Sequence, residues 1–271
     1  MKKELKTVLI TGCSSGMGKR TAYYLAEHGY RVYAASRTPE TLLESSLEHL
    51  VPLHLDITDP QSIERVFGEI EGIDILINNA GYGLVSTVEN VTEEEMLAQF
   101  NVNVFGVMRM CKAVIPNMRY QKEGVIINIS SFLGKIGLPL LTFYNASKYA
   151  VEGITDSLRY ELRDFHIRVH SVMPGFFDTN FARDNLVTNR QTFTEDSPYA
   201  KLVSTLAPTI VEQINRGNDT LEIAQLIAEI IEDDNFPAHC TAGDKAKKFI
   251  PMKKELSDEE FERRVQDYYG L

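Results

Sequence analysis

Short, continuously apolar runs alternate with helical stretches along most of the chain, and this alternation constrains the fold more than any other feature. The strand candidates cover residues 7–11, 31–35, 51–55, 73–78, 125–130 and 168–173. The helical patterns between them lie near residues 17–28, 39–48, 60–70, 92–119 and 142–165. Strands that alternate with helices at this spacing form βαβ units with right-handed crossovers. Because most strand runs are apolar throughout, helices are expected on both faces of the sheet. The chain is therefore expected to be an α/β protein with a doubly wound parallel sheet.

The alternation stops after Met173. Residues 176–219 hold no clear strand and mix aromatic with polar residues, and so long a segment inside a compact domain is usually functional. Helical periodicity returns at residues 221–231, a short strand is expected near 239–242, and the C-terminal end has a helical pattern. No repeat or linker divides the chain. We expect one domain over residues 1–271, with a lid or substrate loop at about 176–219.

Composition excludes several classes of partner. The formal net charge is −10 and there is no extended basic stripe, which argues against nucleic acid and against an anionic membrane surface. The three cysteines are widely spaced and the six histidines show no ligand spacing, so neither a disulfide framework nor a metal site is expected. The basic start is followed by too short an apolar run for a signal peptide, and no stretch is long enough to span a bilayer. A cytoplasmic location is expected.

A glycine-rich loop directly follows the first strand and opens a helix. It runs from Thr11 and Gly12 through Ser14, Ser15, Gly16 and Met17 to Gly18. Gly12 permits a tight turn, Gly16 and Gly18 let backbone amides approach a pyrophosphate, and the helix N-terminus adds a positive dipole. The spacing differs from G-x-G-x-x-G, and a glycine turn without a ligand is the alternative.

The end of the second strand is where the ribose of a bound dinucleotide is expected. The sequence there reads Ser36-Arg37, with no acid to accept a bond from a free 2′-hydroxyl. An arginine suits a 2′-phosphate through charge and fork geometry, so NADP(H) is favoured over NAD(H). The alternative is that Arg37 is an ordinary surface residue.

Tyr144 and Lys148 lie four residues apart in a helical stretch, thirteen residues after Ser131. Four residues place the two side chains on one helix face. At ~5 Å and an effective dielectric of ~20, the ammonium would stabilise a phenolate by roughly 3 kcal/mol, or about two pKa units. The pair is therefore suited to acid–base transfer between a phenol and a carbonyl or alcohol oxygen, and a lowered pKa of Tyr144 is expected.

With these motifs in view, the chain resembles the short-chain dehydrogenase/reductase family over residues 6–245, and its fold is then Rossmann-like. Further motifs follow in the family's order: Asp56-Ile57, Asn78-Asn79-Ala80-Gly81, Asn103 before Val-Phe-Gly, and Pro174-Gly175 with Thr179. The adjacent Ser130 and the nearby Asn101 are less well placed in the motifs. Local features are most similar to 17β-hydroxysteroid and retinol dehydrogenases and their bacterial relatives.

The resemblance implies a catalytic set of Asn103, Ser131, Tyr144 and Lys148. Tyr144 would transfer the proton, Ser131 would hold the substrate oxygen, Lys148 would also bind the nicotinamide ribose, and Asn103 would position a relay water. Asp56 and Ile57 would contact adenine, and Asn79, Ala80, Gly81, Pro174, Gly175 and Thr179 would complete the cofactor site. Plain structural roles are the alternatives: Ser131 as a cap, Asn103 at a helix kink, Asp56 in a turn. The resemblance also implies a homodimer or homotetramer.

The expected function is hydride transfer between NADP(H) and a carbonyl or secondary alcohol. The apolar and aromatic residues of 176–219 and 138–141 favour a hydrophobic small molecule such as a steroid, retinoid or fatty chain, although ordinary lid packing also explains them. An NADP(H)-binding sensor without turnover is the alternative, and the complete Ser/Tyr/Lys/Asn set argues against it. An epimerase or dehydratase acting on a nucleotide sugar is disfavoured because the glycine spacing differs and no extended C-terminal substrate domain follows.

Overall fold

A seven-stranded parallel sheet forms the centre of the computed structural model, which describes residues 5–42, 47–70, 72–179 and 185–271. Its strand order is β3-β2-β1-β4-β6-β7-β9, so the chain winds outward in both directions from β1. The strands are β1 (Thr7–Thr11), β2 (Arg31–Ser36), β3 (Leu50–His54), β4 (Ile75–Asn78), β6 (Gly124–Ile129), β7 (Ile167–Pro174) and β9 (His239–Ala242). The doubly wound α/β fold expected from the sequence is confirmed.

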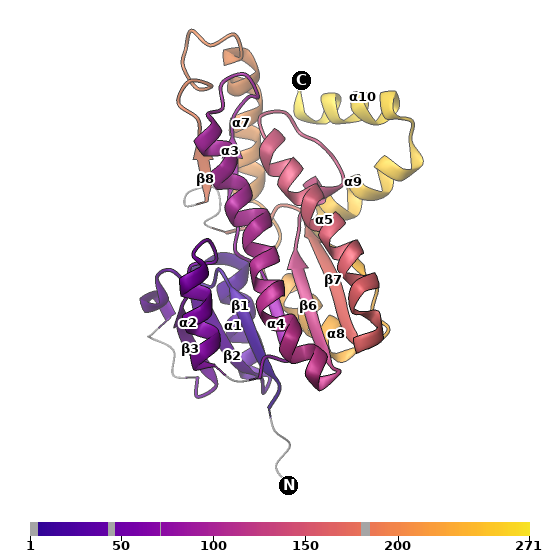
Figure 1. Ribbon diagram of the computed structural model, residues 1–271. Helices are drawn as coiled ribbons and strands as arrows, with labels where there is room; N and C mark the ends of the chain where they lie inside the picture. Colours follow the sequence, from indigo (N-terminus) through magenta and orange to yellow (C-terminus); the bar gives the residue numbers. More distant parts are fainter. Residues whose placement is uncertain (1–4, 43–46, 71, 180–184) are drawn as a thin grey trace.

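Helices cover both faces of this sheet, as Figure 1 shows. Alternate residues of one strand point to opposite faces, so Val8 and Ile10 of β1 join one core cluster while Leu9 joins the other. The first cluster is closed by α1 (Gly16–Glu27) and α8 (Leu221–Glu232), and the second by α2 (Pro60–Glu69), α4 (Val107–Gln121) and α5 (Thr142–Leu162). The fully apolar strands predicted this two-sided burial.

The long helix expected at residues 92–119 is three consecutive segments. It begins at α3 (Glu93–Phe100), where Thr92 and Glu95 form a reciprocal capping box with bonds of 3.2 and 3.0 Å. A π-helical segment, η2 (Asn101–Gly106), follows before α4 begins. Short π segments inside α-helices often occur at functional sites, and this one contains Asn103.

Of the helix expected at 39–48, the structure shows a 3-10 turn, η1 (Pro39–Leu42), and residues 43–46 lie outside the described part.

The expectation that residues 176–219 lack a strand is wrong. β8 (Leu186–Thr188) pairs in parallel with β5 (Gly83–Val85), and α7 (Ala200–Asn215) follows. The buried side chain of Asn189 donates to the backbone carbonyl of Asn90 at 3.1 Å and to Glu95 at 2.8 Å. Three residues are too short to show strand periodicity, and β8 forms because β5, a hundred residues earlier, offers it an edge.

A third apolar cluster lies at the carboxyl end of the sheet. It joins the 3-10 turn η3 (Phe132–Gly134) and α7 to the C-terminal helices α9 (Gly243–Glu255) and α10 (Asp258–Tyr269). In Figure 1, β8, α3, α7 and α10 lie at the end of the molecule opposite the N-terminus. Within the described residues, no helix is long and apolar enough to cross a membrane.

Candidate functional site

A cleft of about 760 Å³ opens at the carboxyl ends of β1, β2, β4 and β6, where doubly wound sheets bind ligands. Its volume falls in the range of about 300–1,000 Å³ that is usual for ligand pockets. It brings together residues that lie far apart in the sequence. The predicted site residues that line it are Thr11, Gly12, Ser14, Ser15, Gly16, Met17, Gly18, Ser36, Arg37, Asp56, Ile57, Asn79, Ala80, Gly81, Tyr144, Lys148 and Thr179.

The first and last glycines of the loop are needed for packing inside the protein. A Cβ on Gly12, whose φ is +72°, would lie 2.7 Å from the Ala80 Cα, and one on Gly18 would lie 2.3 Å from the Asn79 Nδ2. Gly18, which lines the cleft, is therefore also required for close packing against the end of β4. Asn79 secures this junction by donating to the carbonyls of Thr11 and Gly12 at 2.9 and 3.1 Å.

The N-terminus of α1 is available to an anion. Ser15 occupies the N-cap position with extended backbone, but its side chain makes no capping bond. Gly16 has a φ of +56°, and a Cβ there would meet only the Thr179 side chain, at 3.4 Å. The first amides of a helix lack intrahelical partners and carry the positive end of the dipole. The residues present therefore fit a dinucleotide pyrophosphate at this point.

Arg37 follows the last residue of β2 and is exposed at the rim of the cleft beside Asp56. Burial acts to raise the pKa of Asp56, but hydrogen bonds from Thr58 and the charge of Arg37 outweigh it, and the pKa is lowered. The backbone N and the hydroxyl of Thr58 donate to Asp56 Oδ1 at 2.8 and 2.7 Å. Asp56 therefore shapes the turn after β3 as well as lining the cleft, and Arg37 lies beside it at the rim.

Ser131, Tyr144 and Lys148 meet between the end of β6 and the start of α5. The Ser131 hydroxyl is hydrogen-bonded to Tyr144, and its oxygen also accepts the backbone N–H of Leu133 at 3.1 Å, which caps η3. The Lys148 Nζ donates to the carbonyl of Ile129 at 2.8 Å. Asn101, the nearby alternative to Asn103, is instead hydrogen-bonded to Arg109, which donates to Asn101 Oδ1 at 2.8 Å.

The pKa values of Tyr144 and Lys148 are set by burial in the protein without its cofactor. Burial raises the pKa of Tyr144 to about 12, and the bond from Ser131 acts in the opposite direction. Burial lowers the pKa of Lys148 to about 8, and the charge of Glu152 opposes that shift. The lowered pKa expected for Tyr144 is therefore not found, because desolvation outweighs the hydrogen bond with Ser131.

Asn103 lies on the π-helical segment and is almost fully buried. Its Oδ1 accepts the backbone N–H of Tyr82 at 3.1 Å, and its Nδ2 donates to the Tyr82 carbonyl at 2.9 Å and to the Ser147 hydroxyl at 3.1 Å. The side chain thus joins the segment after β4 to α5. A Cβ on Gly81 would lie 3.2 Å from Asn103 Oδ1 and 3.7 Å from Lys148 Nζ, which places both residues beside the cleft.

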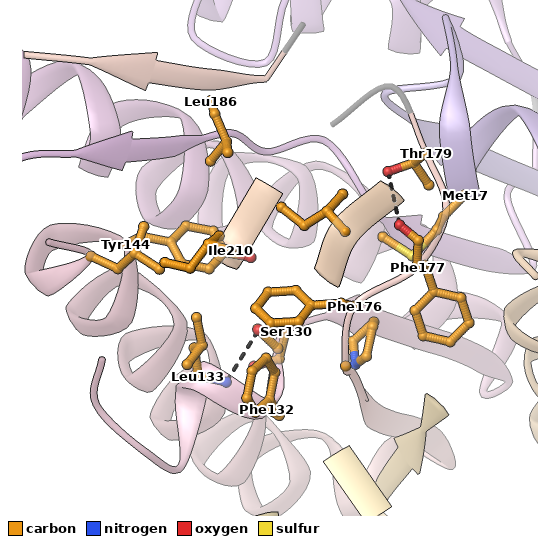
Figure 2. Close-up of a pocket in the computed structure, with 15 residues that line it drawn as sticks. Met17, Ser130, Phe132, Leu133, Tyr144, Phe176, Phe177, Thr179, Leu186 and Ile210 are labelled. Carbon is orange, nitrogen blue, oxygen red and sulfur yellow. Dashed lines mark hydrogen bonds between the residues drawn. The ribbon is translucent and has the colours of Figure 1, made fainter. Parts of the chain in front are cut away.

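An apolar pocket adjoins the cleft and shares Met17, Ser130, Tyr144 and Thr179 with it. Figure 2 shows Tyr144, Leu133, Phe176 and Leu186 around this space. The rings of Phe132 and Phe176 meet edge to face with centroids 5.2 Å apart. The pocket is also lined by Ser131, Leu141, Pro174, Gly175, Phe177, Ile210 and Ile214. Pro174 and Gly175, expected at the cofactor, line this pocket and are not among the residues that line the cleft.

Several residues of the site were not found from the sequence. Ile210 and Ile214 reach the pocket from α7, and Glu94, Asn101 and Val102 line the cleft from α3 and η2. The i, i+4 spacing of the two isoleucines was a visible signal of one helical face. No local feature of the sequence distinguished a helix face that lines a pocket from one that packs in the core. Among the described residues, no group of three or more His, Cys, Asp or Glu side chains could hold a metal ion.

Comparison with known proteins agrees with this geometry. Residues 6–189 match the family described as short chain dehydrogenase. The chain is 37% identical over 265 residues to a 3-ketodihydrosphingosine reductase of Bacteroides thetaiotaomicron, covering 97% of this chain and 98% of that protein. It is 36% identical to an uncharacterized oxidoreductase of Bacillus subtilis, covering 83% and 84% of the two chains.

Solved structures show the same architecture. A short-chain dehydrogenase from Streptomyces avermitilis superposes with a TM-score of 0.84 at 28% identity, covering 99% of both chains. A short chain dehydrogenase from Burkholderia cenocepacia, solved in complex with NADP, gives 0.76 at 25% identity and the same coverage. The protein is an oxidoreductase of the short-chain dehydrogenase/reductase family.

Proposed function

We propose that this protein is an NADP(H)-dependent reductase of a ketone carried on a long apolar chain, with Tyr144 as the proton donor. One observation carries the proposal: Tyr144 lines both the dinucleotide-sized cleft and the apolar pocket. A group at that junction faces cofactor and substrate together. Its partner Ser131 lies in the apolar pocket, and Lys148 lies in the cleft.

The cofactor assignment rests on the rim and floor of the cleft. The first amides of α1, which have no intrahelical partners, suit the pyrophosphate, and the exposed Arg37 guanidinium suits a 2′-phosphate. The Burkholderia relative, which was solved with NADP, supports the same choice. NADPH, when bound, would supply the hydride that reduces the carbonyl carbon.

The protein's own residues would handle the oxygen. Ser131 would donate its hydroxyl to the substrate carbonyl and stabilise the negative charge that develops there. The Tyr144 hydroxyl would give its proton to the same oxygen, and the Lys148 ammonium would stabilise the resulting phenolate. Asn103 would keep Tyr82 and Ser147 fixed around Lys148, through the three bonds that it makes.

The substrate class follows from the lining of the pocket. Beyond Ser130, Ser131 and Tyr144, the walls are mostly Leu, Ile and Phe side chains, with Met17, Pro174, Gly175 and Thr179. Burial of alkyl surface against such walls contributes about 25 cal/mol per Å². The pocket holds about 70 Å³, so it would take the part of an alkyl chain nearest the carbonyl, and the rest of a long chain would extend beyond it. The Bacteroides relative is named for a keto group on a sphingoid chain, and its similarity spans nearly the whole of both proteins.

A single assay tests this function. Purified protein is mixed with NADPH and 3-ketodihydrosphingosine, with a steroid ketone, retinal and a short ketone in parallel, and NADPH absorbance is followed. We expect oxidation with the long-chain ketone and a kcat/KM at least about tenfold lower with the short one, because the apolar contacts are lost. If the steroid ketone or retinal is reduced faster, the proposed substrate class changes from a long-chain ketone to that of the preferred compound. Binding of NADPH without turnover of any ketone would favour the sensor alternative.

Three further assignments belong with this proposal. The segment from about 176 to 219 would act as the lid, since β8 and α7 supply Leu186, Ile210 and Ile214 to the pocket. A cytoplasmic location and a homodimer or homotetramer are expected by likeness to the family. Analytical ultracentrifugation at micromolar concentration tests the oligomer.

A further inference from the structure

Glu152 is a buried acid on α5, one helical turn after Lys148, and only 3% of its surface is exposed. Two nitrogen atoms meet its Oε2 atom: the Lys135 Nζ at 3.0 Å and the His239 Nδ1 at 2.9 Å. Its other oxygen, Oε1, is buried and has no hydrogen-bond partner among the described residues. A buried carboxylate oxygen without a partner is costly, so anchoring alone does not account for the charge.

The carboxylate fastens the loop that carries Ser131 to the helix that carries Tyr144. Lys135 directly follows η3, and its backbone N–H bonds to the Phe132 carbonyl at 3.0 Å. The same turn packs tightly on α5, because a Cβ on Gly134 would lie 3.0 Å from the Lys148 carbonyl oxygen and 3.2 Å from the Glu152 Cγ. A small shift at Glu152 would therefore move Ser131 relative to Tyr144.

On the other side, Glu152 is joined to β9 through His239. The His239 Nδ1 also lies 2.9 Å from the Ser171 hydroxyl, and its Nε2 lies 2.8 Å from Asp156 Oδ1. Both ring nitrogens thus face carboxylates. The titratable groups around the Glu152 carboxylate are Lys135, Lys148, His239 and Cys240, with Asp156 and His170 next to His239.

We propose that Glu152 is a positioning residue for the reaction, which holds Ser131 against Tyr144 through Lys135 and places a carboxylate one helical turn from Lys148. This rests on the proposed function only in assuming that Lys148 acts as a cation. Burial opposes the charge of Lys148, and the Glu152 carboxylate is the group that offsets this effect.

The test compares Glu152→Gln, Glu152→Asp and Lys135→Met in the full-length protein. Glu161→Gln is the matched control, since it makes the same change at an exposed position of α5. The titration midpoint of Lys148 is read by NMR of 13C-labelled lysine, with Lys148→Arg used for assignment. The pH profile of kcat/KM for ketone reduction is measured on the same variants.

Glu152→Gln should lower the Lys148 midpoint by about one pH unit, because the stabilising anion is gone. Lys135→Met should raise the Lys148 midpoint, because the Lys135 ammonium no longer offsets the charge of the Glu152 carboxylate. In Glu152→Asp, the Lys148 titration midpoint should stay near the wild-type value. Its kcat should fall about tenfold, because the shorter side chain shifts the loop that carries Ser131. Thermal melting identifies unfolded variants.

An unmoved midpoint in Glu152→Gln, or shifts of the same sign in Glu152→Gln and Lys135→Met, would overturn the proposal. If Glu152→Gln does not fold, an unmoved midpoint in Lys135→Met has the same consequence. The NMR titration needs no turnover. It therefore decides the role of Glu152 even if every ketone assay fails and the proposed function is lost.

Discussion

The Lys148 Nζ lies 5.7 Å from the centroid of the Tyr144 ring, one turn further along α5. At this separation and an effective dielectric of ~20, a charged ammonium would stabilise a phenolate by roughly 3 kcal/mol. In the cofactor-free protein, burial nevertheless raises the pKa of Tyr144 to about 12. The pair is therefore arranged to assist a phenolate that forms during reaction rather than one that exists beforehand.

Replacing Tyr144 with Phe removes the proton donor and keeps the ring. We expect kcat for reduction to fall by about 10²–10⁴-fold, while the Kd for NADPH, measured by fluorescence, stays within about threefold. Tyr149→Phe, on the same helix but 47% exposed, should leave both unchanged. Turnover at the wild-type rate in Tyr144→Phe would remove Tyr144 from the mechanism.

The pH dependence of reduction should follow Lys148, whose pKa is lowered to about 8. The charged form is the useful one, so kcat/KM should be highest below this value and decline as pH rises through about 8. The profile is measured at saturating NADPH, so that kcat/KM reports the form of the protein that binds the ketone. Lys148→Arg keeps its charge over this range, so its slower reaction should lack the decline. A wild-type profile that stays flat to about pH 10 would contradict the assignment.

Arg37→Ala should discriminate between the two cofactors. Loss of a charged bond to a 2′-phosphate costs about 1.5–3 kcal/mol, which corresponds to about 10- to 100-fold weaker NADPH binding. Binding of NADH, which lacks that phosphate, should change less than about threefold. Arg31→Ala, at the opposite end of β2, is the control for the lost charge. Equal weakening of both cofactors would refute a 2′-phosphate contact.

Gly18→Ala tests the packing of the glycine loop. The added methyl group would lie 2.3 Å from the Asn79 side chain and 2.5 Å from the Gly12 carbonyl oxygen. We expect the free energy of unfolding to fall by about 1–3 kcal/mol, read from urea denaturation. Gly68→Ala is the counterpart, because nothing lies within 4 Å of its added Cβ on α2, and it should stabilise by up to about 1 kcal/mol. A Gly18→Ala protein of unchanged stability would show that the loop has room.

Most of the central fold could be predicted because its signals are local. The apolar strands and the helices between them differ in periodicity, and the predicted range for β1 matches its observed ends, Thr7–Thr11. The site motifs were readable because each sits where a strand ends. Two elements could not be predicted, because residues distant in sequence determine them. β8 depends on its pairing with β5. The π-helical segment contains Asn103, which is hydrogen-bonded to Tyr82 and Ser147.

The sequence by itself determined the parallel sheet, the glycine loop and the order of Ser131, Tyr144 and Lys148, because strand and helix periods and helical spacing are properties of neighbouring residues. Only the tertiary structure decided three other matters: that Gly18 serves packing, that burial raises the pKa of Tyr144, and that Glu152 lies between Lys135 and His239. Burial and charge depend on which distant segments meet. These tertiary contacts follow from the packing of the whole chain and cannot be predicted from any short stretch of sequence.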